Sequence, residues 1–287
     1  MKKIINLGHS PDADDIFMYY AIAFGWVGEG ISFKNQALDI QTLNKMALEN
    51  LLDISAISFG VYPLLFKEQA LLRTGVSFGN GYGPKLVKKR SKNLKKNFKV
   101  ALSGEHTTNA LLFKIAYPEA RIVYKNFLEI EQAILKDEVD AGVLIHESIL
   151  NFDESLEVER EIWDIWCELN KEELPLPLGG MCILRSIPLS LAIQLEDILT
   201  KAVATALKHK PLLSKMLQER NLVRVSDKML EHYLNLYANE DSKTLSPLQI
   251  KALDNLFKIG YEKGIYPQLI HTQDCLIPKD YSSLRNS

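Results

Sequence analysis

The chain has 287 residues, of which 47% are hydrophobic and 24% are charged, and its formal net charge is −2 at pH 7. This is the composition of an ordinary soluble protein that is long enough to form two lobes with separate cores. The near balance of charge gives no reason to expect a nucleic acid or an acidic membrane surface as partner, and no apolar stretch is long enough to span a membrane.

Residues 5–12 predict a strand, a glycine turn and a polar loop, and the apolar spacing of residues 16–21 predicts a helix directly after them. The segment before this strand holds two lysines but lacks the apolar stretch of a secretory signal. We therefore expect a cytoplasmic protein.

The same order returns about a hundred residues later. Residues 100–109 again predict a strand, a turn and a polar loop, and a helix follows until Pro118. Downstream of each unit, at 47–58 and at 134–145, a helix end, an acid and a short buried strand follow one another. Two such units predict two α/β lobes that face each other, with parallel sheets and right-handed crossovers. Two unrelated units could also resemble each other this much by chance.

Two punctuated segments mark the expected lobe boundaries. Two glycines and a proline interrupt the chain at 81–84, and a proline and two glycines do so at 177–180. Glycines absorb large backbone changes at low steric cost, so both segments are candidate hinges, although each could be a plain turn. We expect one lobe from residues 1–84 plus 185–287 and the other from residues 85–184.

The chain after Pro188 is predicted to be helical, because its apolar residues over 191–207 follow helix spacing. A further helix is predicted to begin at Ser246. Proline occupies its first helical position there, a serine–glutamine pair can form a capping box, and Gly264 is placed to end the helix. These helices carry no clustered chemistry, so we expect them to pack back onto the first lobe.

The sequence gives no sign of a metal site or a bound cofactor. Its three cysteines, Cys167, Cys182 and Cys275, are odd in number and scattered, and they match neither a disulfide framework nor a zinc-binding spacing. No glycine-rich loop of the kind that binds dinucleotides or nucleotide phosphates is present. We therefore expect no metal and no cofactor. The sequence carries no signal for an oligomeric state.

His146 is the strongest candidate for chemistry. It follows the short apolar run 141–145, which predicts a buried parallel strand, and ligands of open α/β sheets gather at the carboxyl ends of such strands. Imidazole is the side chain best suited to move protons near neutral pH, and at an ordinary pKa of about 6.5 it would be available as a neutral base. The alternative is a strand-end histidine that only bonds a backbone carbonyl. Glu147 could orient the ring, although neighbours on a strand point to opposite faces.

Hydrogen-bond donors are expected opposite this histidine. Thr107 and Thr108 lie at a predicted helix N-terminus, where free peptide N–H groups, the helix dipole and the hydroxyls favour a carboxylate or phosphate on a small ligand. Thr107 could also simply cap its own helix, and both roles are compatible. Ser58, at the end of the matching strand of the first lobe, could donate a further bond. Three acids are instead expected to serve the dipole of the first helix, namely Asp12, Asp14 and Asp15.

In their order and spacing, these segments resemble the 1,4-dihydroxy-6-naphthoate synthase family of the menaquinone pathway, which acts on cyclic dehypoxanthinyl futalosine. The similarity covers both lobes, at residues 7–11, 42–44, 58, 81–84, 106–108, 145–148 and 174–179. The resemblance implies an α/β fold like that of type II periplasmic binding proteins, with two lobes around a ligand cleft. It also implies a lyase that cleaves the sugar-derived part from a cyclic carboxylate substrate and leaves an aromatic product.

The resemblance also carries over particular residues. The family's proposed general base corresponds to His146. The residues implied as substrate contacts are Ala56, Ile57, Ser58, Thr107 and Thr108. One segment departs from the pattern: some members have a Ser-Pro-Cys-Pro-Asn-Asp loop at the position of residues 10–15, which puts any specific role of this loop in doubt.

Two other functions remain open. A solute-binding protein could share the fold without chemistry, although the missing secretory signal argues against it. Chorismate dehydratase, the sister enzyme of the pathway, resembles this family in fold. The segments around His146 and the paired threonines favour the naphthoate synthase.

Overall fold

The computed structural model describes residues 4–220 and 226–279 and contains two mixed sheets. The first sheet has the order β2–β1–β3–β11–β4, and β5 pairs with β11 beside this path. Its strands are β1 (Ile4–His9), β2 (Ser32–Ala37), β3 (Ile54–Ser58), β4 (Gln69–Leu71), β5 (Ser77–Gly79) and β11 (Leu176–Leu184). In this sheet β1 runs parallel to β2 and β3, whereas β11 runs antiparallel to β3, β4 and β5.

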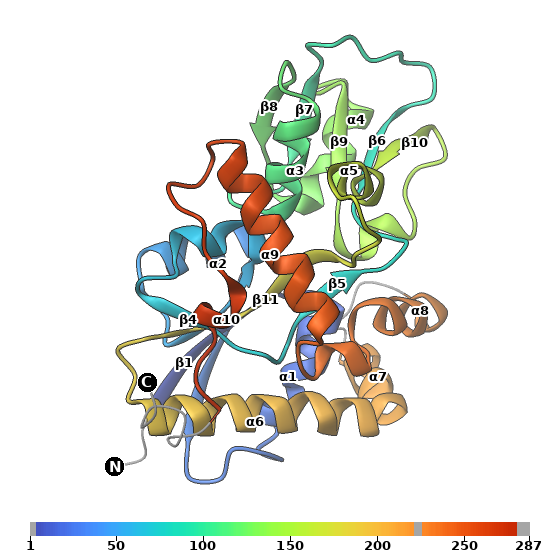
Figure 1. Cartoon of the computed structure of the whole chain (residues 1–287). Coiled ribbons are helices and arrows are strands. Elements are labelled where there is room, and N and C mark those ends of the chain that lie inside the picture. Colours follow the sequence, from blue (N-terminus) through green and yellow to red (C-terminus); the bar gives the residue numbers. More distant parts are fainter. Residues whose placement is uncertain (1–3, 221–225, 280–287) are drawn as a thin grey trace.

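The second sheet has the order β10–β6–β9–β7–β8 and forms the other lobe, at the top of Figure 1. Its strands are β6 (Lys85–Lys89), β7 (Lys99–Leu102), β8 (Arg121–Tyr124), β9 (Ala141–Leu144) and β10 (Leu156–Glu161). Here β7 runs parallel to β8 and β9, and β6 runs antiparallel to β9 and β10.

The expectation of parallel sheets is therefore wrong for part of each sheet. The antiparallel strands β6 and β11 are those that directly follow a passage of the chain between the lobes. Such a strand enters its sheet from the other lobe rather than through a crossover helix on its own face, so its direction is free to oppose its neighbours.

The chain passes from the first sheet to the second between β5 and β6, and it returns between α5 (Ile162–Leu169) and β11. Residues 176–184, which we expected in the second lobe, thus pair with strands of the first sheet. The apolar run of β11 carries no mark of which sheet it joins, and its partners β3, β4 and β5 all precede the first passage.

Helices cover both sheets. Those of the second lobe are α3 (Thr108–Ala116), α4 (Ile130–Leu135) and α5. The remaining α-helices are α1 (Ala13–Ala23), α2 (Ile40–Leu48), α6 (Leu189–Lys208), α7 (Lys210–Glu219), α8 (Asp227–Tyr237), α9 (Pro247–Glu262) and α10 (Thr272–Cys275). Within the described residues, short 3-10 helices connect these elements: η1 (Phe59–Leu64), η2 (Phe127–Glu129), η3 (His146–Ile149) and η4 (Glu240–Ser242). No described helix is both long and apolar enough to cross a membrane.

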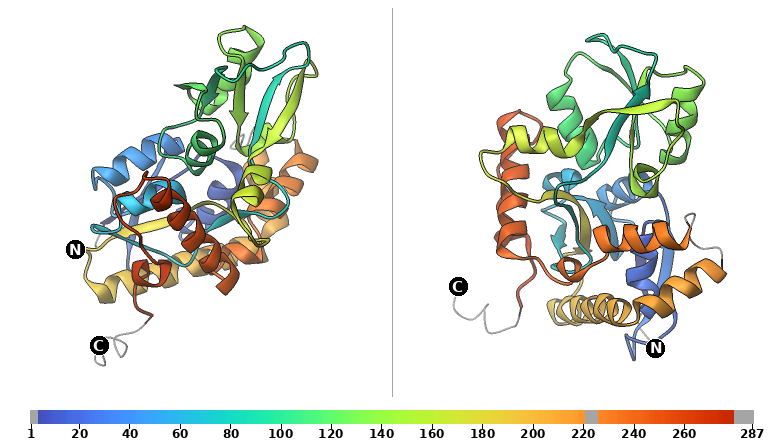
Figure 2. Two further views of the ribbon diagram at one scale, coloured as in Figure 1. Left: turned by 45° about the horizontal axis from the view of Figure 1, so that its top comes forward. Right: turned by 90° about the vertical axis from the view of Figure 1, so that its right-hand side faces the viewer.

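The predicted capping of α9 is confirmed. Ser246 Oγ accepts from the Gln249 N–H at 3.2 Å, and Gln249 Oε1 accepts from the Ser246 N–H at 2.7 Å. Gly264 follows the helix with φ +70°, the left-handed conformation that favours glycine at this place. The helix lies along the side of the molecule, where Asn255 bonds Asn170 at the return passage (Figure 2).

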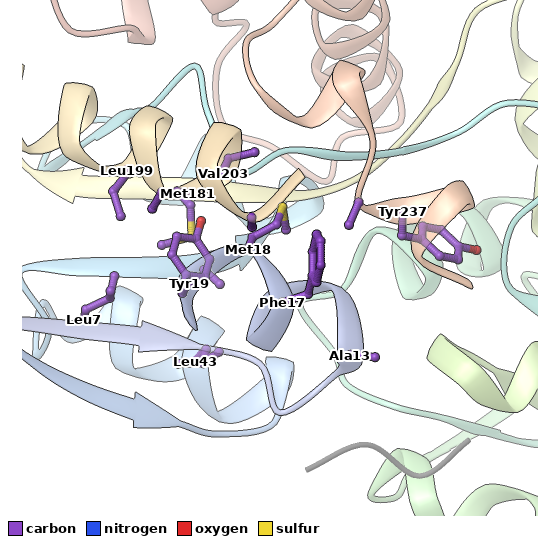
Figure 3. Packing of buried hydrophobic residues seen from close by; sticks show 14 of the residues in the cluster. Leu7, Ala13, Phe17, Met18, Tyr19, Leu43, Met181, Leu199, Val203 and Tyr237 are labelled. Carbon is purple, nitrogen blue, oxygen red and sulfur yellow. The ribbon is translucent and has the colours of Figure 1, made fainter. Parts of the chain in front are cut away.

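The core of the first lobe forms where α1 packs between the sheet and α6. Phe17, Met18 and Tyr19 are fully buried. Tyr19 lies beside Met181 of β11, and Met18 lies towards Val203 of α6 (Figure 3). Burying a large apolar side chain contributes about 1.5–3 kcal/mol. This packing fixes the start of α1, and with it the polar loop that follows β1.

Candidate functional site

A cleft of about 750 Å3, counting its open mouth, lies between the two lobes. It occupies the carboxyl ends of the parallel strands β1, β3, β7 and β9, as expected for an open α/β sheet. Residues at or just after these ends line it: Ser10, Ser58, Ser103 and Ile145. The structure brings together every residue that the sequence singled out for the site, since the lining also includes Ala56, Ile57, Thr107, Thr108 and His146.

His146 lies at the first position of η3, separated by one residue from the end of β9, and its backbone has φ +55°. Its Nδ1 lies 2.7 Å from Oδ2 of Asp12, which comes from the opposite lobe. Its Nε2 is buried and has no hydrogen-bond partner among the described residues. The Phe127 ring packs edge-on against the imidazole at a centroid distance of 4.9 Å. The partner of Nδ1 is therefore a carboxylate, and not the backbone carbonyl of the alternative interpretation.

The charge state of His146 differs from the expectation. Burial alone would lower its pKa, but the negative charge of Asp12 and its hydrogen bond outweigh this effect, and Glu147 and Asp14 add to the increase. Together they raise the pKa of His146 to about 9. The assumption of an ordinary pKa is wrong because the acidic loop that faces the ring belongs to a distant part of the sequence. At neutral pH the imidazole is therefore protonated.

The acidic loop at 10–15 is part of the site. Asp12, Asp14 and Asp15 all line the cleft, although we expected them to serve the dipole of α1 instead. Asp12 occupies the N-cap position but makes no capping bond; its Oδ2 accepts from the Ser10 hydroxyl at 2.5 Å in addition to facing His146. Hydrogen bonds between two charged groups are stronger than those to a neutral group, so the Asp12 carboxylate bonds the imidazole of the other lobe instead of capping α1.

The two other aspartates have raised pKa values. Burial and the charges of Asp15 and Asp12 raise the pKa of Asp14 well above its ordinary value, and the Tyr233 hydroxyl donates to Asp14 Oδ1 at 3.1 Å. Burial and the charge of Asp12 raise the pKa of Asp15 to about 6. Glu147 joins this group from the second lobe and accepts the Ala13 N–H at 3.0 Å. Glu147 thus binds the start of α1 rather than orienting the imidazole.

The hydroxyls of Thr107 and Thr108 both make hydrogen bonds within the protein. Thr107 Oγ1 accepts from the Ala110 N–H at 3.2 Å and donates to Gly104 O at 3.0 Å, which confirms its capping of α3. Thr108 Oγ1 accepts from the Gly60 N–H at 3.0 Å and donates to Leu178 O at 3.1 Å. The hydroxyls were expected to add donors for an anion, but their protons already have carbonyl acceptors.

Peptide N–H groups supply the donors instead. The first N–H groups of a helix have no intrahelical acceptor, and in α3 these belong to Thr108 and Asn109, which both line the cleft. Asn109 is 8% exposed, and its Oδ1 has no partner among the described residues. The positive end of α3 therefore faces the cleft opposite the acidic loop.

Asn44 is a site residue that the sequence reasoning did not single out. Its side chain is fully buried; Oδ1 accepts from the Ser58 N–H at 2.9 Å, and Nδ2 donates to Ser58 Oγ at 3.2 Å. Nδ2 also lies 3.4 Å from His106 O in the second lobe. Because Ser58 Oγ accepts the bond from Asn44, the hydroxyl proton of Ser58 remains available to a ligand in the cleft. The one sequence signal for it was its place within the similar segment 42–44.

No cluster of three or more His, Cys, Asp or Glu side chains suited to a metal ion occurs in the described part of the chain. The three cysteines are free thiols, and burial raises the pKa of Cys182 and of Cys275. A neutral buried thiol is a poor nucleophile. The chemistry of the cleft therefore centres on one imidazole, several carboxyl groups and the N–H groups of α3.

Residues 5–262 match a protein-family model described as menaquinone biosynthesis. A curated protein of Thermus thermophilus named 1,4-dihydroxy-6-naphthoate synthase is 28% identical over 261 residues, which cover 91% of this chain and 95% of that protein. A solved structure from Archaeoglobus fulgidus superimposes with a TM-score of 0.84 at 31% identity, covering 91% of this chain and 98% of that one.

A Candida albicans protein described as having the generic periplasmic-binding-protein fold superimposes with a TM-score of 0.67 at 10% identity, covering 92% of this chain and 91% of that one. At this identity the likeness concerns the fold alone. The expected two-lobed α/β fold of the periplasmic-binding-protein type is confirmed.

Proposed function

Because this chain belongs to the menaquinone-biosynthesis family, we propose that it is a 1,4-dihydroxy-6-naphthoate synthase, a carbon–carbon lyase that converts cyclic dehypoxanthinyl futalosine to 1,4-dihydroxy-6-naphthoate. The observation that carries this proposal is the buried Nε2 of His146, which has no hydrogen-bond partner in the described part of the chain and lines the cleft together with the N-terminus of α3. The similar Thermus protein carries the name of this activity.

The substrate carboxylate is proposed to bind at the start of α3. The N–H groups of Thr108 and Asn109 and the positive end of the helix favour an anion there. The Ser58 hydroxyl, held by Asn44, adds a donor from the first lobe. Ala56 and Ile57, which precede Ser58 in β3, also line the cleft and are proposed to contact the ring system of the substrate.

His146 is proposed as the general base. In its neutral form, Nε2 removes a proton from the bound substrate. The electron pair left behind drives cleavage of the carbon–carbon bond to the sugar-derived part, which leaves with the bonding electrons and takes up a proton. The remaining ring becomes aromatic and keeps its carboxylate. A base must lose its own proton before it acts, so the raised pKa of His146 makes it a stronger base that is available in a smaller fraction of molecules at neutral pH.

Product analysis tests this proposal. The purified protein is incubated separately with cyclic dehypoxanthinyl futalosine and with chorismate, and the products are identified by liquid chromatography and mass spectrometry. We expect 1,4-dihydroxy-6-naphthoate from the first and no conversion of the second. Binding of the futalosine derivative without turnover would instead indicate a solute-binding protein, and conversion of chorismate would indicate a dehydratase.

A further inference from the structure

We propose that Asp12 is a positioning residue that forms, with His146, a proton-transfer dyad across the cleft, one member from each lobe. The catalytic meaning of this dyad rests on the proposed function, whereas the pairing itself is testable without any substrate.

The contact defines which nitrogen of the ring carries the proton. Asp12 Oδ2 lies 2.7 Å from His146 Nδ1, and a carboxylate oxygen can only accept a hydrogen bond. Nδ1 must therefore be the protonated nitrogen. In the neutral imidazole this leaves the lone pair on Nε2, the atom that is buried at the cleft without a partner among the described residues. The pairing thus leaves Nε2 as the unprotonated nitrogen, which the proposed proton abstraction requires.

The surroundings hold both members in place. Asp12 is 3% exposed, and its Oδ2 also accepts from the Ser10 hydroxyl. The backbone of His146 has φ +55°, a conformation that is uncommon for a residue with a side chain and that recurs at functional sites. Next to it, Glu147 accepts the Ala13 N–H. Two consecutive residues of the second lobe therefore bind two consecutive residues of the first.

Four carboxyl groups face the imidazole. Asp12, Asp14 and Asp15 come from the loop and start of α1, and Glu147 comes from η3. Asp14 is bonded by Tyr233, Asp15 by the Ser10 N–H, and Glu147 by the Ala13 N–H. Asp12 alone of these four has a bond to the ring. Direct pairing, and not the general negative charge of the cluster, is therefore expected to dominate the behaviour of His146.

The test compares Asp12→Asn with the matched control Glu147→Gln. Both remove one nearby negative charge with little change of shape, but Glu147→Gln leaves the Nδ1 contact intact. The protein is labelled with 15N-histidine, and its imidazole signals are followed by NMR from pH 5 to about pH 10. Of the chain's six histidines, His146 is assigned as the one whose signals vanish in His146→Asn.

We expect Asp12→Asn to lower the proton affinity of His146 by at least about tenfold, and Glu147→Gln to lower it much less. Asp12→Ala should shift it in the same direction as Asp12→Asn, and it serves if the asparagine variant does not fold. Equal shifts in Asp12→Asn and Glu147→Gln, or no shift in either Asp12 variant, would overturn the dyad.

Kinetics then separate the dyad from the function. With the substrate, Asp12→Asn should lower kcat by about 100-fold or more with little change in KM, because the asparagine amide can donate to Nδ1 and place the proton on Nε2. The acid limb of its residual rate should move to lower pH. A normal rate and pH profile in Asp12→Asn, beside an inactive His146→Asn, would overturn the dyad but keep the function. If Asp12→Asn shifts the titration of His146 but the wild-type protein makes no product, the pairing stands and the proposed function is overturned.

Discussion

Asn44 and Ser58 bond each other twice: the Ser58 N–H donates to Asn44 Oδ1 at 2.9 Å, and Asn44 Nδ2 donates to Ser58 Oγ at 3.2 Å. Asn44→Ala should therefore leave a buried N–H without an acceptor and release the Ser58 side chain. We expect a loss of about 1–3 kcal/mol in the free energy of unfolding, measured by urea denaturation, together with weaker substrate binding.

Ser58→Ala is the control for that variant. It keeps the bond from its N–H to Asn44, so its unfolding free energy should change by less than about 1 kcal/mol, while substrate binding weakens. A large loss of stability in Ser58→Ala with unchanged binding would show that this pair serves only the fold.

Thr107→Val tests the cap of α3. Valine keeps the shape of the side chain but loses the oxygen that accepts from the Ala110 N–H. The unfolding free energy should fall by about 0.5–2 kcal/mol in Thr107→Val. In Thr107→Ser it should stay close to the wild-type value, because the serine hydroxyl can still accept this bond. Calorimetry of the three proteins measures this, and equal stability of the valine and serine variants would contradict the role of the cap.

Gly60→Ala tests the close approach of the two lobes. A Cβ at this position would lie 2.9 Å from both the Cα and the backbone N of Thr108, so the start of α3 would have to move away. We expect a destabilisation of about 1–3 kcal/mol and a raised KM. In Gly83→Ala the new Cβ would meet first a methyl group of Leu176, at 3.0 Å, which can adjust. Similar effects of both substitutions would argue against a specific contact at Gly60.

The raised pKa of Asp15 predicts how the free energy of unfolding depends on pH. Its pKa is raised to about 6 in the folded protein, above about 3.9 in an unfolded chain, so the folded state holds this proton more tightly. The stabilisation that the folded state gains by holding this proton is complete below pH 4 and is lost as the pH rises through about 6. Thermal unfolding midpoints of the wild type should therefore fall over this range more steeply than those of Asp15→Asn. Parallel curves would contradict the raised pKa.

The site residues that the sequence predicted share a local signal. His146 follows a short apolar run, Thr107 and Thr108 begin a helix, and Ser58 ends a buried strand. The parallel strands β1 and β3, and likewise β7 and β9, bring their carboxyl ends to the cleft, so these local signals were enough to place the residues together.

The pairings within the site were not predictable in the same way. Asp12 and His146 lie in different lobes, and no periodicity links residues so far apart in the chain. Asp12 at a helix start had a sufficient local explanation, the helix dipole, which the contact with His146 overrides. For β11, an apolar run identifies a buried strand but not its partners, so its membership in the first sheet depended on the tertiary packing.

His146→Asn is the most direct test of the central claim, that this imidazole is the base. We expect wild-type kcat/KM to rise with pH until it levels off near pH 9, because the base acts only after losing its proton. In His146→Asn the rate should fall on the order of 100- to 10,000-fold, and any residual activity should lose this pH dependence. Substrate binding, measured by calorimetry, should persist because the carboxylate is held by other residues. A variant that binds the substrate and turns it over at the wild-type rate would contradict the account.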